Sequence, residues 1–414
     1  MTGRRTPLAV VLVHGAAALV TVACLGWTGW TGVREGGTAL AFGALVAAGE
    51  LARRTGPGSE REPAPLGAAG ALAYALLGQN GGQPTAHGVP QVVAVVVAGA
   101  LAGAAPLIAQ GRGPSPDHMA RRVLTVAFSA VCFQPLCDSG RIDAWTVRGP
   151  FYAVVLLLLL GLTGLCDAVI AAAMTRARTR YPYGPLLRDE LRALLGIGSA
   201  VCATGVVMAL GVAVAGLWAL PVFCVPLLLT QLSLRRHALI RATYAQTITS
   251  LARATEVAGY TPHGHARRVA VLSRAVGREL GLSGPALTVL EYAALMHDIG
   301  QLSLVDPVPD GATALLPTAE QRRIALLGGA VVRRTGAPAE VAVVVECQAD
   351  PYREQPLSAR IVRAVNAYED LAGEDAGAGP LSALERLRLG TGHDYQPEVV
   401  ESLARVLSRG GVVL

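Results

Sequence analysis

Long apolar runs recur through the first 234 residues of the chain. A helix needs about 20 apolar residues to cross a bilayer. Five runs meet this length and three are shorter or more polar, which together predict about eight transmembrane helices, at 7–30, 89–109, 150–174, 192–214 and 217–234, and at 38–51, 64–80 and 123–137. If 38–51 and 64–80 form a re-entrant pair, six spans remain. We therefore expect residues 1–234 to be a polytopic membrane domain.

The apolar pattern changes at Arg235 and Arg236, and neither Pro nor Gly occurs from there to Ala258. This stretch predicts a continuous connecting helix over 235–258. Six positions in it follow a 4-3 spacing that could form the seam of a parallel homodimer, namely Ile240, Tyr244, Thr247, Leu251, Ala254 and Ala258. Only three of the six are bulky, so a helix that packs on its own domain is an equal expectation.

Residues 259–414 show helical periodicity. Val269, Leu272 and Val276 lie on one helical face before Gly281, and Ser283 and Pro285 begin the next helix. Two further helices are expected at 358–371 and 396–407. Because no segment alternates as a strand does, we predict an all-α fold for the whole chain, a membrane bundle followed by an all-α domain.

Composition and charge fit a membrane location. Hydrophobic residues make up 52% of the chain and charged residues only 15%, where soluble proteins carry about 25%. The net charge is +6, and the loops predicted on the N-terminal side of the membrane (1–6, 52–65, 110–122 and 175–191) hold twelve arginines against three in the opposite loops. This asymmetry predicts a cell-membrane protein with its N-terminus and its C-terminal domain in the cytoplasm. The basic residues are thus expected to face membrane lipid, and no DNA or RNA partner is expected.

His14 and Asp167 are ionisable residues that fall well inside predicted spans, and such groups are costly there unless they are paired. His14 and Asp167 lie at nearly the same depth, about seven residues from the cytoplasmic ends of their helices. One hypothesis is that they pair with each other within the bundle. The alternative, which we favour, is that each bonds to a neighbouring backbone or hydroxyl group.

Four segments of the C-terminal domain carry a family resemblance. They are YTPHGHARRV at 260–269, AALMHDIG at 293–300, LSARIVRAVNAYEDL at 357–371 and GHDYQPEVV at 392–400. In this order they resemble the HD superfamily of phosphohydrolases, and the HD-GYP type in particular. The resemblance implies that His265, His297 and Asp298 are metal ligands and that Asp298 also orients the nucleophile. Imidazole and carboxylate donors suit Mn, Fe, Ni or Zn. A divalent ion lowers the pKa of water and offsets charge on a phosphoryl oxygen.

The chain also departs from the family pattern. The fourth ligand, an Asp in the family, falls on Asn366, whose neutral amide oxygen is a weaker ligand. Gln301 replaces a Lys, and the family's further His positions fall on Ala325-Leu326 and near Glu346-Cys347-Gln348, with no Gly-Tyr-Pro loop after them. At most a one-metal site is therefore expected. Arg267, Arg268 and Gln301 are candidates to contact a substrate phosphate.

Two functions follow from this mixture of kept and lost residues. The first is a membrane-anchored signalling protein whose degenerate HD domain relays a membrane signal by binding a cytoplasmic protein partner or a nucleotide. The alternative is an active metal-dependent phosphohydrolase on a nucleotide or other phosphodiester. The cofactor is a divalent metal if the site is occupied and none otherwise. Transport by the helical bundle ranks below both, because we find no internal repeat.

Overall fold

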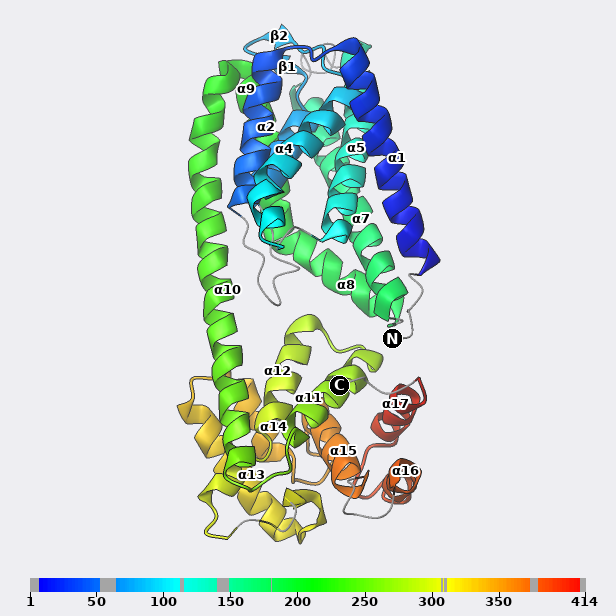
Figure 1. Cartoon of the computed structure of the whole chain (residues 1–414), viewed down its shortest axis with the longest axis vertical. Helices are drawn as coiled ribbons and strands as arrows, with labels where there is room; N and C mark the ends of the chain where they lie inside the picture. Colours follow the sequence, from blue (N-terminus) through cyan, green and yellow to red (C-terminus); the bar gives the residue numbers. More distant parts are fainter. Residues whose placement is uncertain are drawn as a thin grey trace. The chain divides into compact units, whose positions relative to one another are not determined.

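The computed structural model describes residues 7–52, 65–111, 115–139, 149–179, 181–306, 308, 311–372 and 379–409. These residues are almost wholly helical, which confirms the predicted all-α class, and they form two compact units, Met1–Ala238 and Leu239–Leu414 (Figure 1). The long helix α10 contributes to both units. The only strands among the described residues form a ribbon of two residues on each side, β1 (Gln79–Asn80) and β2 (Gln83–Pro84), in which Gly81 and Gly82 make the turn at positive φ.

The first unit is a helical bundle. Its helices are α1 (Leu8–Thr31), α2 (Gly36–Leu51), α3 (Pro65–Ala75), α4 (Val89–Ala109), α5 (Pro116–Asp138), α7 (Gly149–Thr179), α8 (Tyr183–Ala193), the π-helical η1 (Leu194–Gly198), α9 (Ser199–Ala215), the 3-10 turn η2 (Gly216–Trp218) and the start of α10 (Ala219–Val257). Every residue of helix α3 except Ala68 is buried, and Tyr74 on it packs in a core with Phe42 and Phe133.

Glycines set the close packing of this bundle. A Cβ added at Gly49 would lie 2.3 Å from the backbone nitrogen of Gly67, and one at Gly103 would lie 2.2 Å from the carbonyl oxygen of Ala47. Only glycine therefore lets α2 approach α3 and α4 this closely, which is the small-residue packing typical of membrane helices.

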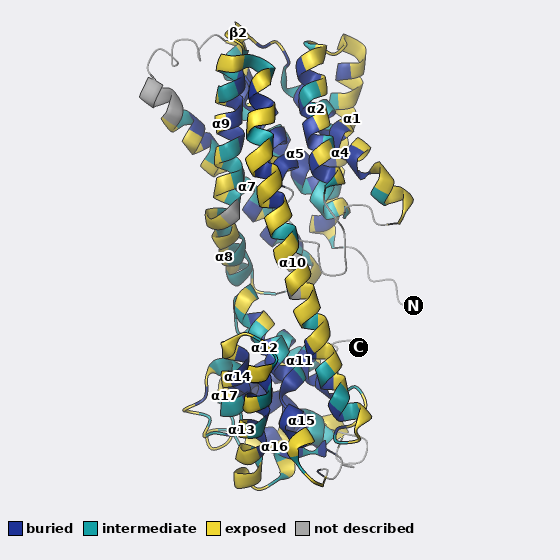
Figure 2. Ribbon diagram, turned by 90° about the vertical axis from the view of Figure 1, so that its left-hand side faces the viewer, coloured by how far each residue is buried: buried dark blue, intermediate teal, exposed yellow. Residues whose placement is uncertain are grey.

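Four helical segments are long and apolar enough to cross a membrane, namely Leu8–Thr31, Val89–Ala109, Val154–Thr179 and Ser199–Val257, the last of which contains α9 and α10. Large apolar side chains lie exposed on the outside of these helices, and Figure 2 shows the exposed faces of α1 and α10. Each of the eight predicted spans overlaps a helix, while the number that cross the membrane stays a prediction.

The predicted span 192–214 differs from the structure. The helix α8 ends at Ala193, and Gly196 has non-helical backbone angles (φ −84°, ψ −113°) within η1 before α9 begins at Ser199. A glycine tolerates this conformation, which the apolar pattern alone does not reveal.

His14 and Asp167 do not pair with each other in the structure. His14 Nε2 lies 2.9 Å from Asp117 Oδ1, and Asp167 accepts two hydrogen bonds from Arg121, the shorter at 2.6 Å. Both partners come from α5, which packs against α1 and α7 and offers each helix a group of complementary charge. The pairing hypothesis is thus wrong. The favoured alternative named a backbone or hydroxyl group; Asp167 does accept a bond from the Thr125 hydroxyl, but charged side chains are the nearer partners.

The second unit begins with the C-terminal part of α10. It continues through α11 (His265–Glu279), α12 (Gly284–Met296), the 3-10 turns η3 (Ile299–Ser303) and η5 (Thr313–Leu315), α13 (Thr318–Arg334), α14 (Ala339–Cys347), α15 (Leu357–Ala372), α16 (Gly379–Leu389) and α17 (Pro397–Ser408). Val269, Leu290, Ile361 and Leu403, from four of these helices, meet in one buried core.

The predicted connecting helix 235–258 is the second half of α10 and packs on its own domain. Ile248 and Ala252 are buried. Ile248 belongs to the hydrophobic core of the second unit, and Leu251 packs against that core. Ile240 and Tyr244 are exposed. A homodimer through this helix stays a prediction.

Candidate metal centre

Three elements bring the predicted ligands together. His265 is the first residue of α11 and follows Gly264, whose φ of 74° favours glycine. His297 and Asp298 come directly after α12, and Asn366 projects from α15. Gly300 lets the following turn η3 lie against the backbone of α13, since a Cβ there would stand 2.0 Å from Ile324 O. This contact fixes the position of the His297-Asp298 segment.

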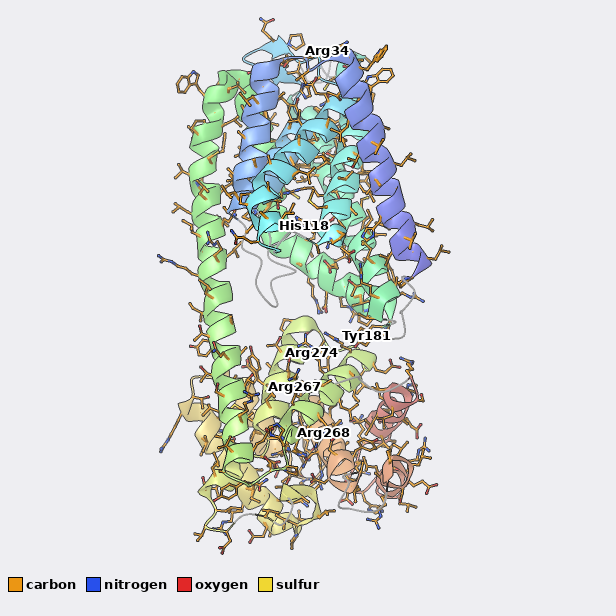
Figure 3. The ribbon with its side chains drawn as sticks, viewed as in Figure 1. Arg34, His118, Tyr181, Arg267, Arg268 and Arg274 are labelled. Atoms are coloured by element: carbon orange, nitrogen blue, oxygen red, sulfur yellow. The ribbon has the colours of Figure 1, made fainter. Side chains whose placement is uncertain are left out.

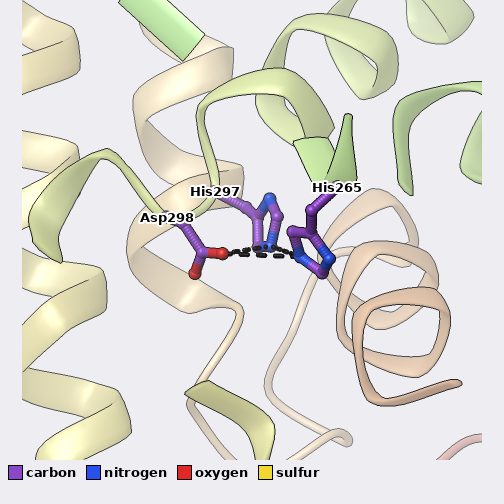
Figure 4. Close-up of side chains that lie close together, drawn as sticks. All are labelled: His265, His297 and Asp298. Carbon is purple, nitrogen blue, oxygen red and sulfur yellow. Dashed lines mark hydrogen bonds and ion pairs between the residues drawn. The ribbon is translucent and has the colours of Figure 1, made fainter. Parts of the chain in front are cut away.

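The side chains converge on one buried point (Figure 4). His297 Nε2 lies 3.0 Å from Asp298 Oδ2 and 3.4 Å from His265 Nε2, and His265 Nε2 lies 3.5 Å from Asp298 Oδ2. Asn366 Oδ1 lies 3.0 Å from Nε2 of both imidazoles. The two histidine side chains and Asp298 are each at most 5% exposed. The structure therefore unites His265, His297, Asp298 and Asn366, as the family resemblance implies.

These separations fit a divalent ion. Groups that each lie about 2.1 Å from one ion stand roughly 3.0–3.4 Å from their neighbours in octahedral or tetrahedral coordination. His297 Nδ1 lies 2.8 Å from the carbonyl oxygen of Ala294 and donates to it, which leaves Nε2 as the lone-pair nitrogen of the neutral ring. Asp298 Oδ2 is buried without a well-aligned donor among the described residues. Only a proton or a metal ion between these lone pairs relieves their repulsion, and the donor set suits Mn, Fe, Ni or Zn.

Thr313 holds the oxygen ligands in place. Its hydroxyl donates to Asp298 Oδ1 at 3.0 Å and accepts from Asn366 Nδ2 at 3.1 Å. The second bond turns the amide so that Asn366 Oδ1 faces the two imidazoles. Gln348 Nε2 donates to the backbone oxygen of His297 at 2.8 Å and fixes the other side of the same segment.

The pKa values of the two histidines diverge. Burial lowers the pKa of His265 to about 4, so its imidazole is neutral and ready to bind a cation. Burial also disfavours a charged His297, but the adjacent Asp298 carboxylate outweighs it and raises the pKa of His297 to about 9. Burial opposes ionisation of Asp298 as well, and the charge of His297 overcomes it and holds that pKa below its usual range. Without a metal, the centre therefore keeps a cation by protonating His297.

A further carboxylate, which the sequence interpretation missed, stands beside the centre. Asp370 Oδ1 lies 3.9 Å from His265 Nε2, and the side chain is 3% exposed. Its Oδ2 accepts a hydrogen bond from the backbone nitrogen of Ala314 at 3.0 Å. Burial raises the pKa of Asp370 to about 7, and the charge of Asp298 adds to the effect. Its sequence signal is its position four residues after Asn366, on the same helical face.

A polar cavity of about 220 Å³ opens beside the metal ligands. Its polar lining comes from Asp298, Thr313, Thr318, Gln321, Gln348, Arg363, Asn366, Asp394 and Tyr395. Arg363 is its basic residue and donates to the backbone oxygen of Asp350 at 2.7 Å. The sequence interpretation did not single out Arg363, although it lies three residues before Asn366 on the same helix.

The predicted phosphate-binding residues lie elsewhere. Arg267, Arg268 and Gln301 do not line the cavity. Arg267 is exposed, and Arg268 bonds to Glu369 at 2.9 Å (Figure 3). The side chain of Gln301 is buried, with Nε2 3.5 Å from the carbonyl oxygen of Gly311. Their role toward a substrate phosphate stays a prediction.

The positions of the family's further histidines hold no ligand-ready group. Ala325 is buried and apolar, and Leu326 is exposed. Glu346 forms an ion pair with Arg333 through both of its carboxylate oxygens. Among the described residues, the cluster of three His, Cys, Asp or Glu side chains with metal-binding spacing is His265, His297 and Asp298. The geometry is that of a single metal centre.

Comparison with known proteins agrees with the all-α fold and with the candidate metal centre. Residues 263–370, from the loop before α11 to the last turn of α15, match the family described as HD domain. The second unit therefore carries an HD superfamily domain. A cyclic di-GMP phosphodiesterase from Thermotoga maritima is 25% identical over 162 residues, which are 35% of this chain and 44% of that protein. The chain thus spans less than half the length of this curated relative.

Proposed function

We propose that this protein is a membrane-anchored, metal-dependent phosphohydrolase with a single metal centre. The observation that carries the proposal is the convergence of two imidazole nitrogens, Asp298 Oδ2 and Asn366 Oδ1 on one buried point beside a polar cavity. The HD domain match over 263–370 and the phosphodiesterase relative support the same reaction class.

The chemistry of each group follows from its place. A divalent ion, when bound, supplies positive charge to a phosphoryl oxygen. Asp298, held through Oδ1 by Thr313, directs Oδ2 to the point where the ion would bind, so that it would hold the ion and orient a nucleophile beside it. Arg363 places a guanidinium on the cavity wall, where it would bind a substrate phosphate.

The cavity bears on the substrate. Its volume of about 220 Å³ is below the roughly 300–1,000 Å³ of pockets for drug-sized ligands. This size favours a small phosphate ester or one nucleotide over a cyclic dinucleotide. The relative's substrate is therefore one member of the test panel rather than the expected answer.

Hydrolysis by the purified full-length chain in detergent tests the proposal. The chain is loaded with Mn²⁺ or Fe²⁺ and given nucleoside monophosphates, linear phosphodiesters and a cyclic dinucleotide. We expect turnover of at least one of them, reduced about 100-fold or more in His297→Ala, since one ligand of the ion is lost. His393→Ala is the matched control, because His393 is exposed and does not line the cavity. A metal-loaded chain that hydrolyses none of these substrates would contradict the proposal.

A non-catalytic relay is the second candidate, and the residues at the family's other ligand positions favour it. Ala325 is apolar and Glu346 is held by Arg333, so the chemistry of a two-metal site is absent from these described positions. Helix α10 (Ala219–Val257) has residues in both units and ends six residues before the segment that matches the HD domain, so it is a continuous element through which a signal could pass. In that case, capture of a cytoplasmic partner would be the same with and without a chelator.

We also propose a multi-pass topology with the N-terminus and the HD domain in the cytoplasm. Four helices of membrane-spanning length and the excess of arginine on one set of loops support it. Reporter fusions after residues 52, 139 and 234 test it. A reporter active only outside the cytoplasm at residue 234 would contradict it.

A further inference from the structure

The predicted ligands alone do not carry enough negative charge to balance a divalent ion. An imidazole binds a metal ion in its neutral form, Asn366 is an amide, and Asp298 contributes one negative charge. A divalent ion would then leave one uncompensated positive charge among side chains that are at most 6% exposed. Uncompensated charge in such an enclosed site is strongly unfavourable, so a second buried anion would raise the affinity for the ion.

We propose that Asp370 supplies this second negative charge and so replaces the function that Asn366 cannot perform. The proposal deepens the proposed function and rests on it. Asp370 lies one helical turn after Asn366 on the same face of α15, with its carboxylate 3.9 Å from His265 Nε2. Asn366 Nδ2 lies 3.5 Å from Asp370 Oδ2, so the amide connects the ligand position to the carboxylate behind it.

The surroundings hold Asp370 toward the centre. Its Oδ2 accepts the backbone N–H of Ala314, in the turn η5 that also carries Thr313. Thr313 in turn bonds to both Asp298 and Asn366. The two carboxylates and the amide are thus parts of one hydrogen-bonded frame around the two imidazoles. Asp298 Oδ2 faces the same point, 3.0 Å from His297 Nε2 and 3.5 Å from His265 Nε2.

This arrangement separates two tasks that one residue performs in the family pattern. Asn366 Oδ1 lies 3.0 Å from Nε2 of both imidazoles, where it would bind the ion. The negative charge comes from Asp370, on the next turn of the helix. A structural role for Asp370 is the competing explanation, because its bond to Ala314 also ties η5 to α15. An asparagine at 370 can still accept that bond, so a change to Asn removes the charge and retains the contact.

The test measures the binding of Mn²⁺ to the full-length chain in detergent. Binding is detected as a decrease in the electron paramagnetic resonance signal of free Mn²⁺. We expect Asp370→Asn to weaken binding about tenfold or more and Asn366→Asp to tighten it. The exchange variant Asn366→Asp/Asp370→Asn keeps the same number of carboxylates and should regain at least native affinity. Glu401→Gln is the matched control, since the exposed Glu401 pairs with the exposed Arg388 and belongs neither to the ligands nor to the cavity lining; it should bind as the native chain does.

The possible outcomes distinguish a failure of this inference from a failure of the proposed function. Native affinity in Asp370→Asn would overturn the inference and leave the metal centre standing. An exchange variant that stays as weak as Asp370→Asn while retaining native thermal unfolding would also overturn it, because charge at the site would then not be the cause. If the native chain itself binds no Mn²⁺, the proposed function and the inference fail together.

Discussion

A single methyl group at Gly300 should disturb the metal centre through the backbone behind it. Gly300 lies two residues after Asp298, where η3 meets α13. In Gly300→Ala the new Cβ would stand 2.0 Å from the carbonyl oxygen of Ile324 and 2.7 Å from the backbone nitrogen of Gly328. Real Cβ contacts essentially never fall below 3.0 Å, so one of two backbone segments must move by at least about 1 Å.

The size of the effect follows from that displacement. Neither neighbour is a flexible side chain, so the overlap should cost about 1–3 kcal/mol or more, as overpacking does in other cores. For a domain of about 150–250 residues, each kcal/mol lowers the melting temperature by roughly 2–4 °C. The segment that carries His297 and Asp298 moves with η3, so metal affinity should fall together with stability.

Thermal unfolding and Mn²⁺ titration of the full-length chain measure both effects. Gly284→Ala is the matched control, because nothing lies within 4 Å of a Cβ added at that helical position. It should be neutral or slightly stabilising, by up to about 1 kcal/mol. If Gly300→Ala matches Gly284→Ala in both measurements, the close approach of η3 and α13 does not hold the centre in place.

Two further changes probe the frame and the protonation of the centre. Thr313→Val should destabilise the domain by about 1–3 kcal/mol, since it leaves buried Asp298 Oδ1 without its donor and Asn366 Nδ2 with only the longer bond to Asp370 Oδ2, at 3.5 Å. Thr313→Ser should retain both bonds, and equal melting temperatures for the two variants would refute this. Metal affinity should rise with pH, by about tenfold per unit between pH 6 and 8.5. The sign follows because the pKa of His297 is raised to about 9, so the metal-free imidazole is protonated at neutral pH and the ion must displace that proton. Calorimetric titrations in buffers of different ionisation enthalpy measure the released proton, and an affinity that does not change over this range would contradict the reasoning.

The sequence predicts the helices well, and also the three ligands His265, His297 and Asp298, for identifiable reasons. Apolar runs and turn residues act locally, so α4 matches its predicted bounds of 89–109, and α11, which carries Val269, Leu272 and Val276, ends at Glu279 shortly before Gly281. His265, His297 and Asp298 belong to ordered motifs whose spacing is characteristic of the family. Their convergence could therefore be expected before the fold was known.

The remaining features depend on contacts between distant segments. The partner of His14 is Asp117, 103 residues away, and no local pattern indicates that α5 lies between α1 and α7. Arg363 and Asp370 are ordinary charged residues of an amphipathic helix until the side that faces the cavity is known. The break at Gly196 depends on how α8 and α9 pack, because most glycines in the apolar runs remain helical.

The metal content of the purified full-length chain, measured by elemental mass spectrometry beside His297→Ala and His393→Ala, tests the central claim most directly. The convergence of His265, His297, Asp298 and Asn366 predicts close to one divalent transition metal ion per chain, kept in His393→Ala and lost in His297→Ala. Background metal in all three proteins, after exposure to Mn²⁺, Fe²⁺, Ni²⁺ and Zn²⁺, would contradict the account.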